Sequence, residues 1–162
     1  MKTLMVYMSV HNGNTRKIAR AMAEVLDADM FKPDEISPDC VKDYELVGFG
    51  SGVYFGRHHK SLLKFIENAD GRGKKAFIFS TSGNKKLPLI NNFDRVILKK
   101  LSKSGFEVVG SFDCRGRKAY YNNPGMMIKP FCKSGEEDRP NEKDIENARK
   151  FAERMKKSFQ EG

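Results

Sequence analysis

The segment SVHNGNT, residues 9–15, joins two stretches of very different pattern. Residues 2–8 (KTLMVYM) before it form an almost unbroken apolar run, which predicts a buried strand. After it, Ile18 and Met22 begin an apolar stripe at helical spacing, which predicts a helix over residues 14–26. A buried strand that leads through a short polar segment into a helix is typical of an α/β protein with a parallel sheet.

The same alternation of strands and helices continues along the chain. It predicts a single domain over residues 1–162, in which a doubly wound parallel sheet has helices on both faces and right-handed crossovers. An irregular segment at about residues 115–139 interrupts the pattern; long loops of this kind are usually functional or mobile, and both interpretations stay open. Strands are expected at residues 29–31, 45–50, 75–80 and 106–112, and further helices over residues 91–104 and 140–159 and from about His58.

Composition narrows the class of protein. No run approaches the roughly 18 apolar residues of a membrane helix, and the N-terminus has no signal-peptide pattern, so we expect a cytoplasmic protein without membrane contact. The three cysteines, Cys40, Cys114 and Cys132, are widely spaced, which disfavours a disulfide framework and a metal site. A buried, unreactive thiol is the favoured interpretation of Cys114, and a redox-active thiol is the alternative.

The junction at residues 9–15 has the features of an anion site. A helix start exposes backbone N–H groups, and its dipole adds positive potential. Gly13 permits a sharp turn, while Ser9 and Thr15 offer short hydroxyl groups. The segment is neither a P-loop nor a GxGxxG loop, which disfavours a nucleoside triphosphatase. The alternative is a purely structural helix cap by Ser9 or Asn14.

Three motifs together resemble the flavodoxin family. Residues 9–15 resemble its phosphate loop, GFGSGVYFGRHHK (residues 48–60) its second flavin loop and STSGN (residues 80–84) its third. The spacer between Ser9 and Gly13 is one residue longer than in the short-chain electron carriers. The resemblance implies a five-stranded parallel sheet of order 2-1-3-4-5 that binds flavin mononucleotide (FMN) beyond its carboxyl edge.

The resemblance also assigns residues to the cofactor by matching motif. We expect Tyr54 to contact the flavin ring and Phe55 to be the aromatic residue that packs on the sheet. For His58 and His59, at the expected helix start, capping or solvated roles are favoured over a proton donor or anion contact near the flavin. The phosphate would be held by Ser9, His11, Asn12, Gly13, Asn14 and Thr15, one side of the ring by Ser51, Gly52, Val53, Tyr54, Phe55 and Gly56, and the other by Thr81, Ser82, Gly83 and Asn84.

The charge has two interpretations that stay open: a rim of cations that only solvates the loops, or a surface that attracts an acidic partner or an anionic substrate. Lysine and arginine number 30 against 21 acidic residues, a net charge of +9. Many of these cations follow predicted flavin loops and would surround the cofactor, which suits an acidic redox partner such as a ferredoxin, or NAD(P)H. No nucleic-acid motif is evident. The expected positive collar comprises Arg57, Lys60, Lys85, Lys86, Arg115, Arg117 and Lys118.

Two functions therefore stay open. One is an FMN-binding protein in electron transfer, which we favour because no catalytic acid–base pair can be named. The other is an FMN-dependent NAD(P)H oxidoreductase that reduces a quinone or similar small acceptor, for which Tyr120, Tyr121 and Phe131 could build a substrate lid. A phosphoacceptor receiver is disfavoured, because the first strand leads into Met-Ser-Val-His rather than clustered aspartates. In either favoured case the flavin carries the redox chemistry.

Overall fold

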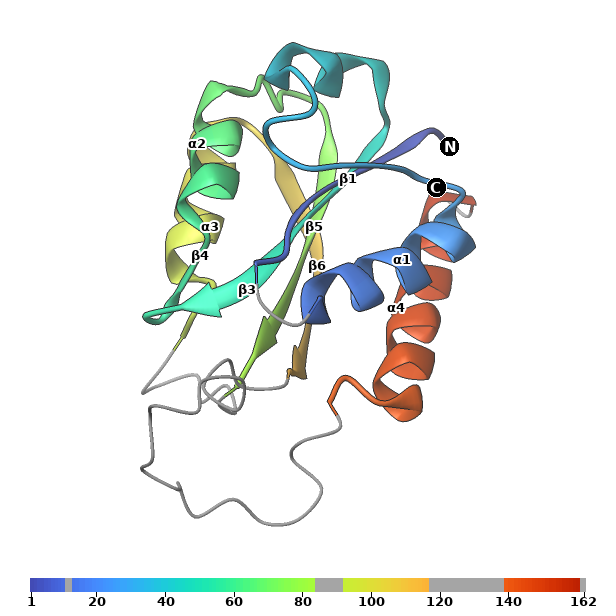
Figure 1. Ribbon diagram of the computed structural model, residues 1–162. Helices are drawn as coiled ribbons and strands as arrows, with labels where there is room; N and C mark the ends of the chain where they lie inside the picture. Colours follow the sequence, from blue (N-terminus) through green and yellow to red (C-terminus); the bar gives the residue numbers. More distant parts are fainter. Residues whose placement is uncertain (11–12, 84–91, 117–138, 161–162) are drawn as a thin grey trace.

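A twisted parallel sheet forms the middle layer of the protein (Figure 1), a computed structural model that describes residues 1–10, 13–83, 92–116 and 139–160. A two-residue strand, β4 (Arg57–His58), pairs antiparallel with β3 (Leu46–Tyr54) outside the parallel path. The predicted fold class is confirmed, because the main strands have the order 2-1-3-4-5 once β4 is set aside. Along the path lie β2 (Asp29–Phe31), β1 (Thr3–Met8), β3 (Leu46–Tyr54), β5 (Lys75–Ser82) and β6 (Glu107–Arg115).

Helices cover both faces of this sheet, as Figure 1 shows. One face carries α1 (Asn14–Leu26) and α4 (Glu142–Gln160), and the other carries α2 (Lys60–Asn68), α3 (Arg95–Lys103) and the 3₁₀ helix η1 (Pro38–Asp43). Alternate residues of each strand therefore enter two separate cores. The α2–α3 core is built around Val47, Phe49 and Ile78, and the α1–α4 core around Met5, Phe77 and Phe151.

Two glycines of β3 make room for aromatic rings of β5. Gly48 is paired with Phe77 and Gly50 with Phe79 in the strand register. A Cβ atom at either glycine would overlap the ring of its partner. Both phenylalanines are fully buried in the α1–α4 core, so the absence of side chains on β3 lets the rings lie across the neighbouring strand.

Several predicted boundaries were wrong. β3 does not end at Gly50 but continues to Tyr54 and turns back into β4. His58 therefore belongs to a strand, and α2 begins only at Lys60. The reason is local: a two-residue turn lets the segment pair with itself, which sequence periodicity does not reveal.

The third predicted helix begins later in the chain than expected. α3 begins at Arg95 rather than near residue 91, because Asp94 takes the position before the first helical turn. Most of the predicted loop at about 115–139 lies outside the described residues, between the end of β6 and the start of α4. Among the residues described, no helix is both long and apolar enough to cross a membrane.

Candidate functional site

The β1–α1 junction combines an open helix start with a buried hydroxyl group. Gly13 precedes α1 with a left-handed φ of 65°, and no side chain of the described residues caps the helix. The predicted capping role of Ser9 or Asn14 is therefore wrong. The first turn contains no acidic residue, and the hydroxyl oxygen of Ser9 is buried without a hydrogen-bond partner. Because a buried unpaired hydroxyl is costly, this junction is built as if to receive an acceptor from outside the chain.

Hydrogen bonds join the start of α1, the end of β5 and the end of β6 at this edge of the sheet. The hydroxyl groups of Thr15 and Thr81, both buried, are hydrogen-bonded at 2.8 Å and join α1 to the end of β5. The backbone N–H of Gly116 donates to the carbonyl of Ser82 at 2.9 Å, which joins the end of β6 to the same strand. A Cβ atom at Gly116 would lie 2.6 Å from the Asn14 side-chain nitrogen, so the amide of Asn14 packs directly on that backbone.

The β3–β4 hairpin forms the second wall. Phe55 and Gly56, at its turn, have left-handed φ values of 50° and 73°. Two successive positive φ values are typical of a type I′ hairpin turn, in which a phenylalanine at the first position is uncommon. The side chain of Phe55 is fully exposed, so the expectation that it packs on the sheet was wrong.

Tyr54 turns back across its own loop instead. Its hydroxyl oxygen accepts a hydrogen bond from the backbone N–H of Val10 at 3.3 Å, and its ring meets His59 edge-on with centroids 5.5 Å apart. A Cβ atom at Gly52 would lie 2.7 Å from the Tyr54 hydroxyl oxygen. Burial raises the pKa of this phenol, so it stays neutral and able to donate near neutral pH. Tyr54 therefore links the second loop to the first.

A buried chain of polar side chains supports the second loop. The Ser51 hydroxyl oxygen lies 3.1 Å from Nδ1 of His58, whose Nε2 lies 3.1 Å from a carboxylate oxygen of Asp94. Asp94 was not predicted as a site residue. Its only sequence signal is an aspartate just before a helix, which would ordinarily be taken for a cap. His59, by contrast, does cap α2, because its Nδ1 accepts from the N–H of Ser61.

The ends of β5 and β6 complete this edge. Ser82 is buried and pairs with Arg115 in the register, and an Arg115 guanidinium nitrogen donates to the carbonyl oxygen of Gly83 at 3.2 Å. Of the predicted cofactor residues, the structure brings together those of the three loops that it describes. His11, Asn12 and Asn84 lie outside the described residues.

A cavity of about 430 Å³ lies between these strand ends and α4. Cys114 lines it, and burial raises the pKa of this thiol to about 12, which agrees with the expected unreactive role. Arg139 and Asp144 also line the cavity, and the guanidinium of Arg139 forms two hydrogen bonds with the carboxylate of Asp144. In the described part of the chain, no cluster of ligating side chains suits a metal ion.

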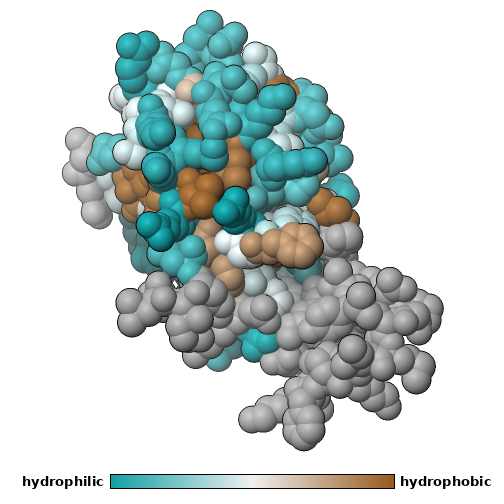
Figure 2. Space-filling model, turned by 90° about the vertical axis from the view of Figure 1, so that its left-hand side faces the viewer, coloured by the Kyte–Doolittle hydropathy of each residue, from teal (hydrophilic) through white to brown (hydrophobic). Residues whose placement is uncertain are grey.

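Positively charged side chains lie both at this edge of the sheet and along the groove between α2 and α3. Arg57 and Lys60 are exposed beside the second loop, while the other predicted collar residues, apart from Arg115, lie outside the described residues. A groove of about 1200 Å³ between α2 and α3 is lined by further cations, among them Arg95, Lys99 and Lys103. On this face of the molecule, hydrophilic side chains surround a smaller hydrophobic area (Figure 2). The basic surface thus continues down one side of the protein.

Fold and site together define a flavodoxin-like α/β protein whose functional edge is built from three strand–helix junctions. A family model described as a flavodoxin domain matches residues 4–129. The chain belongs to the flavodoxin family, and membership implies a flavin cofactor.

Individual relatives agree with this assignment. The uncharacterized protein MJ0298 of Methanocaldococcus jannaschii is 42% identical over 159 residues, which cover 98% of this chain and 100% of that protein. Among solved structures, oxidised flavodoxin 1 from Bacillus cereus has a TM-score of 0.68 at 18% identity and covers 94% of this chain and 95% of its own. A flavodoxin from the domain Archaea has a TM-score of 0.62 at 17% identity, with 94% of each chain covered. At these identities the structures support the shared fold.

The residues present fit a flavin phosphate. The orphaned hydroxyl of Ser9 offers a donor, and the uncapped start of α1 offers backbone donors and a positive dipole end. No described atom lies within 4 Å of the position that a Cβ would take at Gly13, so the turn leaves open space. Arg16 and Lys17 at the start of α1 add positive charge, and the first helical turn contains no acidic residue.

Proposed function

We propose that this protein binds FMN at the carboxyl edge of the sheet and acts in electron transfer between redox partners. The observation that carries the proposal is the buried, unpartnered hydroxyl of Ser9 beside the uncapped start of α1. A buried polar group without a partner is rarely retained unless a ligand satisfies it. When bound, FMN supplies the capacity to take up and release electrons.

Different residues of the chain would contact the phosphate and the two sides of the flavin ring. Ser9, Gly13, Asn14 and Thr15 surround the expected phosphate position, and the resemblance adds His11 and Asn12. The hairpin formed by residues 51–58 supplies one wall for the ring, on which Tyr54 offers an aromatic surface. Thr81, Ser82 and Gly83, with Asn84 by resemblance, supply the other wall. The strand register supports this division, because it places Gly52 beside Thr81.

Electron transfer is favoured over substrate chemistry because two titratable groups in and next to the second loop are buried. His58 and Asp94 are both buried and bonded to each other, so neither is presented to a substrate. The exposed groups there are the cations Arg57 and Lys60, which suit an acidic partner protein. The same cations would also attract NAD(P)H, and this keeps an FMN-dependent oxidoreductase as the second candidate.

A titration tests the cofactor. Flavin-free protein added to FMN should quench its fluorescence with a 1:1 end point, and FAD and riboflavin should bind more weakly because the site is built around one terminal phosphate. Protein that leaves FMN fluorescence unchanged would refute the proposal. Mixing the FMN-loaded protein with NADH or NADPH in a stopped-flow instrument then separates the two functions. Rapid loss of flavin absorbance indicates the oxidoreductase, and reduction only by a reduced ferredoxin indicates the electron carrier.

A further inference from the structure

Ser51, His58 and Asp94 form a continuous buried hydrogen-bonded chain beneath the second loop. All three residues are almost fully buried, with relative exposures of 0%, 3% and 4%. The Ser51 hydroxyl has three neighbours: it donates to the carbonyl of Gly52 at 2.8 Å, accepts from the backbone N–H of His59 at 3.0 Å, and meets Nδ1 of His58 at 3.1 Å. A nucleophilic triad is excluded because this hydroxyl is inaccessible to a substrate.

The number of available protons fixes the state of the ring. A hydroxyl group has one proton to donate and two lone pairs with which to accept. Since the Ser51 proton goes to the Gly52 carbonyl, which can only accept, Nδ1 of His58 must donate its own proton to Ser51. With Asp94 ionised, Nε2 donates to its carboxylate. The hydrogen-bond pattern then places a proton on both ring nitrogens, that is, an imidazolium, whereas a neutral ring would require the proton on Asp94 instead.

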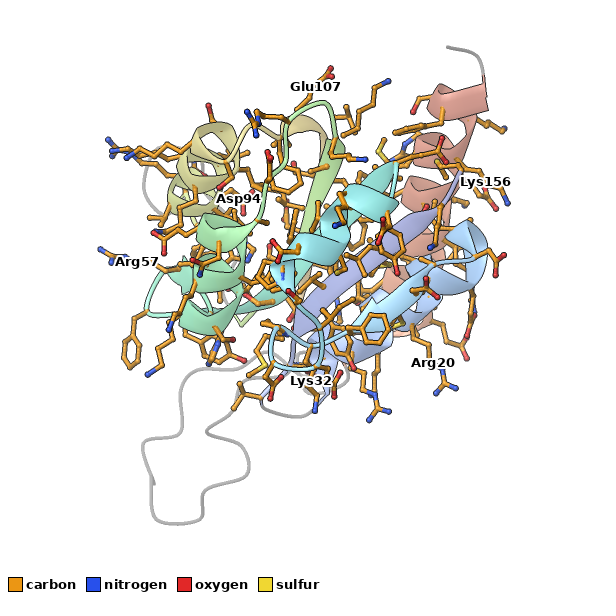
Figure 3. All side chains as sticks on the ribbon, turned by 90° about the horizontal axis from the view of Figure 1, so that it is seen from above. Arg20, Lys32, Arg57, Asp94, Glu107 and Lys156 are labelled. Carbon is orange, nitrogen blue, oxygen red and sulfur yellow. The ribbon has the colours of Figure 1, made fainter. Side chains whose placement is uncertain are left out.

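Asp94 supports this assignment by its orientation. It occupies the position before α3 where an aspartate normally caps the helix, yet its carboxylate makes no capping hydrogen bond. It is directed at His58 instead, from a position 36 residues further along the chain. Figure 3 shows Asp94 on the same side of the molecule as Arg57, which extends outward from the hairpin.

We propose that His58 is a proton-dependent positioning residue for the Gly52 carbonyl group. When the proton on Nδ1 leaves for bulk water, the ring keeps Nε2–H on Asp94 and Nδ1 becomes an acceptor. The Ser51 hydroxyl then turns its proton from the Gly52 oxygen to Nδ1, because two lone pairs would otherwise face each other. No heavy-atom bond changes, and one hydrogen bond to Gly52 is lost for each proton released.

Charged and titratable groups surround the His58 ring on its own segment, on β3 and at the start of α3. Its own segment contributes the cations Arg57 and Lys60 and the imidazole of His59, and α3 contributes the anion Asp94 and the cation Arg95. From β3, Tyr54 contributes a neutral phenol that packs against His59. Asp94 is the one anion among these groups, and it is hydrogen-bonded to the ring.

The consequence for the cofactor rests on the proposed function. Gly52 lies in the loop assigned to the flavin ring, so a carbonyl held by Ser51 at low pH and released at higher pH would make that wall of the site pH-dependent. The chain's own groups can be observed without flavin, however. The failure of this inference and the failure of FMN binding are therefore separable.

The test uses ¹⁵N-labelled, flavin-free protein observed by NMR between about pH 5 and pH 9, where histidines titrate. At the low end, both ring nitrogens of His58 should have imidazolium shifts. On titration Nδ1 should lose its proton, and the Val53 amide, which shares a peptide plane with the Gly52 carbonyl, should shift with the same midpoint. His58→Gln should abolish the coupled Val53 shift, whereas the control His59→Asn, which keeps a capping side chain, should retain it.

Two outcomes would overturn the inference. One is a His58 ring with an unprotonated nitrogen throughout the pH range. The other is a ring that titrates while the Val53 amide of the wild-type protein stays still. Should His58→Gln fail to fold, the wild-type titration and the His59→Asn control still decide the matter. With FMN added, the dissociation constant should change with pH at the His58 midpoint in the wild type and in His59→Asn.

Discussion

The hydroxyl oxygens of Thr15 and Thr81 lie 2.8 Å apart in a buried hydrogen bond that joins the first turn of α1 to the end of β5. The two threonines thus share one structural interaction, although only Thr15 belongs to the expected phosphate loop. Substitution of either by valine removes the same bond. Any difference between the two variants must then come from what else each hydroxyl does.

Thr15→Val should weaken FMN binding by about 1–3 kcal/mol, because a hydrogen bond to a phosphate is charge-assisted. Thr81→Val is the matched control, and both variants should lose about 1 kcal/mol of stability from the shared bond. Fluorescence titration with FMN and riboflavin makes the comparison. Thr81→Val should change FMN and riboflavin affinity by the same factor, because the ring wall to which Thr81 is assigned serves both ligands. Equal losses of FMN and riboflavin affinity in Thr15→Val would show that Thr15 does not serve the phosphate.

Ser9→Ala should have opposite effects on stability and on binding. Removing an unpaired buried hydroxyl should stabilise the flavin-free protein by about 1 kcal/mol, while the loss of a phosphate donor lowers FMN affinity. Thr3→Val removes the other buried, unpaired hydroxyl among the described residues, at the far end of β1. It should stabilise the protein similarly and leave FMN affinity unchanged. Urea unfolding and FMN titration of both variants decide the matter; a Ser9→Ala variant with wild-type FMN affinity would contradict the assignment.

Gly50→Ala should destabilise the fold by about 1–3 kcal/mol, because the added methyl group overlaps the ring of Phe79 in a closely packed core. The free energy of unfolding of the flavin-free protein, measured with urea, gives the effect. Adding Phe79→Leu should recover part of the loss relative to the sum of the two single substitutions. Additive losses in the double variant would indicate that the glycine and the ring do not compete for the same space.

Reversal of the cations beside the second loop should slow the encounter with an acidic partner. Arg57→Glu with Lys60→Glu should reduce the rate of electron exchange with a ferredoxin several-fold at low salt and flatten its salt dependence, because steering is screened over about 8–10 Å near physiological salt. FMN affinity should change little. The control pair, Lys156→Glu with Lys157→Glu near the C-terminal end of α4, carries the same change of charge on the opposite side of the molecule from Arg57. Equal rates for the two pairs would leave net charge, rather than this edge, as the cause.

Cys114 should resist alkylation. Burial raises its pKa to about 12, so the reactive thiolate is scarce at neutral pH. The rate of iodoacetamide labelling, mapped by mass spectrometry, should rise about tenfold per pH unit from pH 7 to 9 without a plateau. The same shift favours the folded state below the thiol's unfolded pKa, and this contribution is lost as pH rises toward about 12. A plateau below pH 9 would indicate an activated thiol.

Much of the fold followed from local pattern. The bounds of α1 and β2 were predicted correctly, because an apolar stripe at helical spacing and a short apolar run are local signals. The three junctions could be expected to meet, since parallel strands carry their carboxyl ends to one edge. The hairpin after Ser51 was missed because a segment rich in glycine and aromatic residues looks irregular until its two arms pair.

The environment of His58 lay beyond the sequence for a different reason. Its hydrogen bond to Asp94 joins residues that are 36 positions apart, and these meet because α2 and α3 pack on the same face of the sheet. Tyr54 and Phe55 point in different directions because of the left-handed turn at Phe55. The Tyr54 ring lies across the loop, and the Phe55 ring extends into solvent. Tertiary geometry of this kind has no counterpart in residue spacing.

The fit of the Phe77 and Phe79 rings over Gly48 and Gly50 limits how the family can diverge at this point. Neither strand can acquire larger side chains on its own, since a bulkier residue in β3 has no room while the rings of β5 remain. In an alignment of homologues, positions 48 and 77 should therefore vary together, as should positions 50 and 79, with small residues on one strand wherever the other keeps an aromatic ring. Covariation at these pairs of positions would identify relatives with the same packing of the sheet, whether or not their cofactor loops are similar.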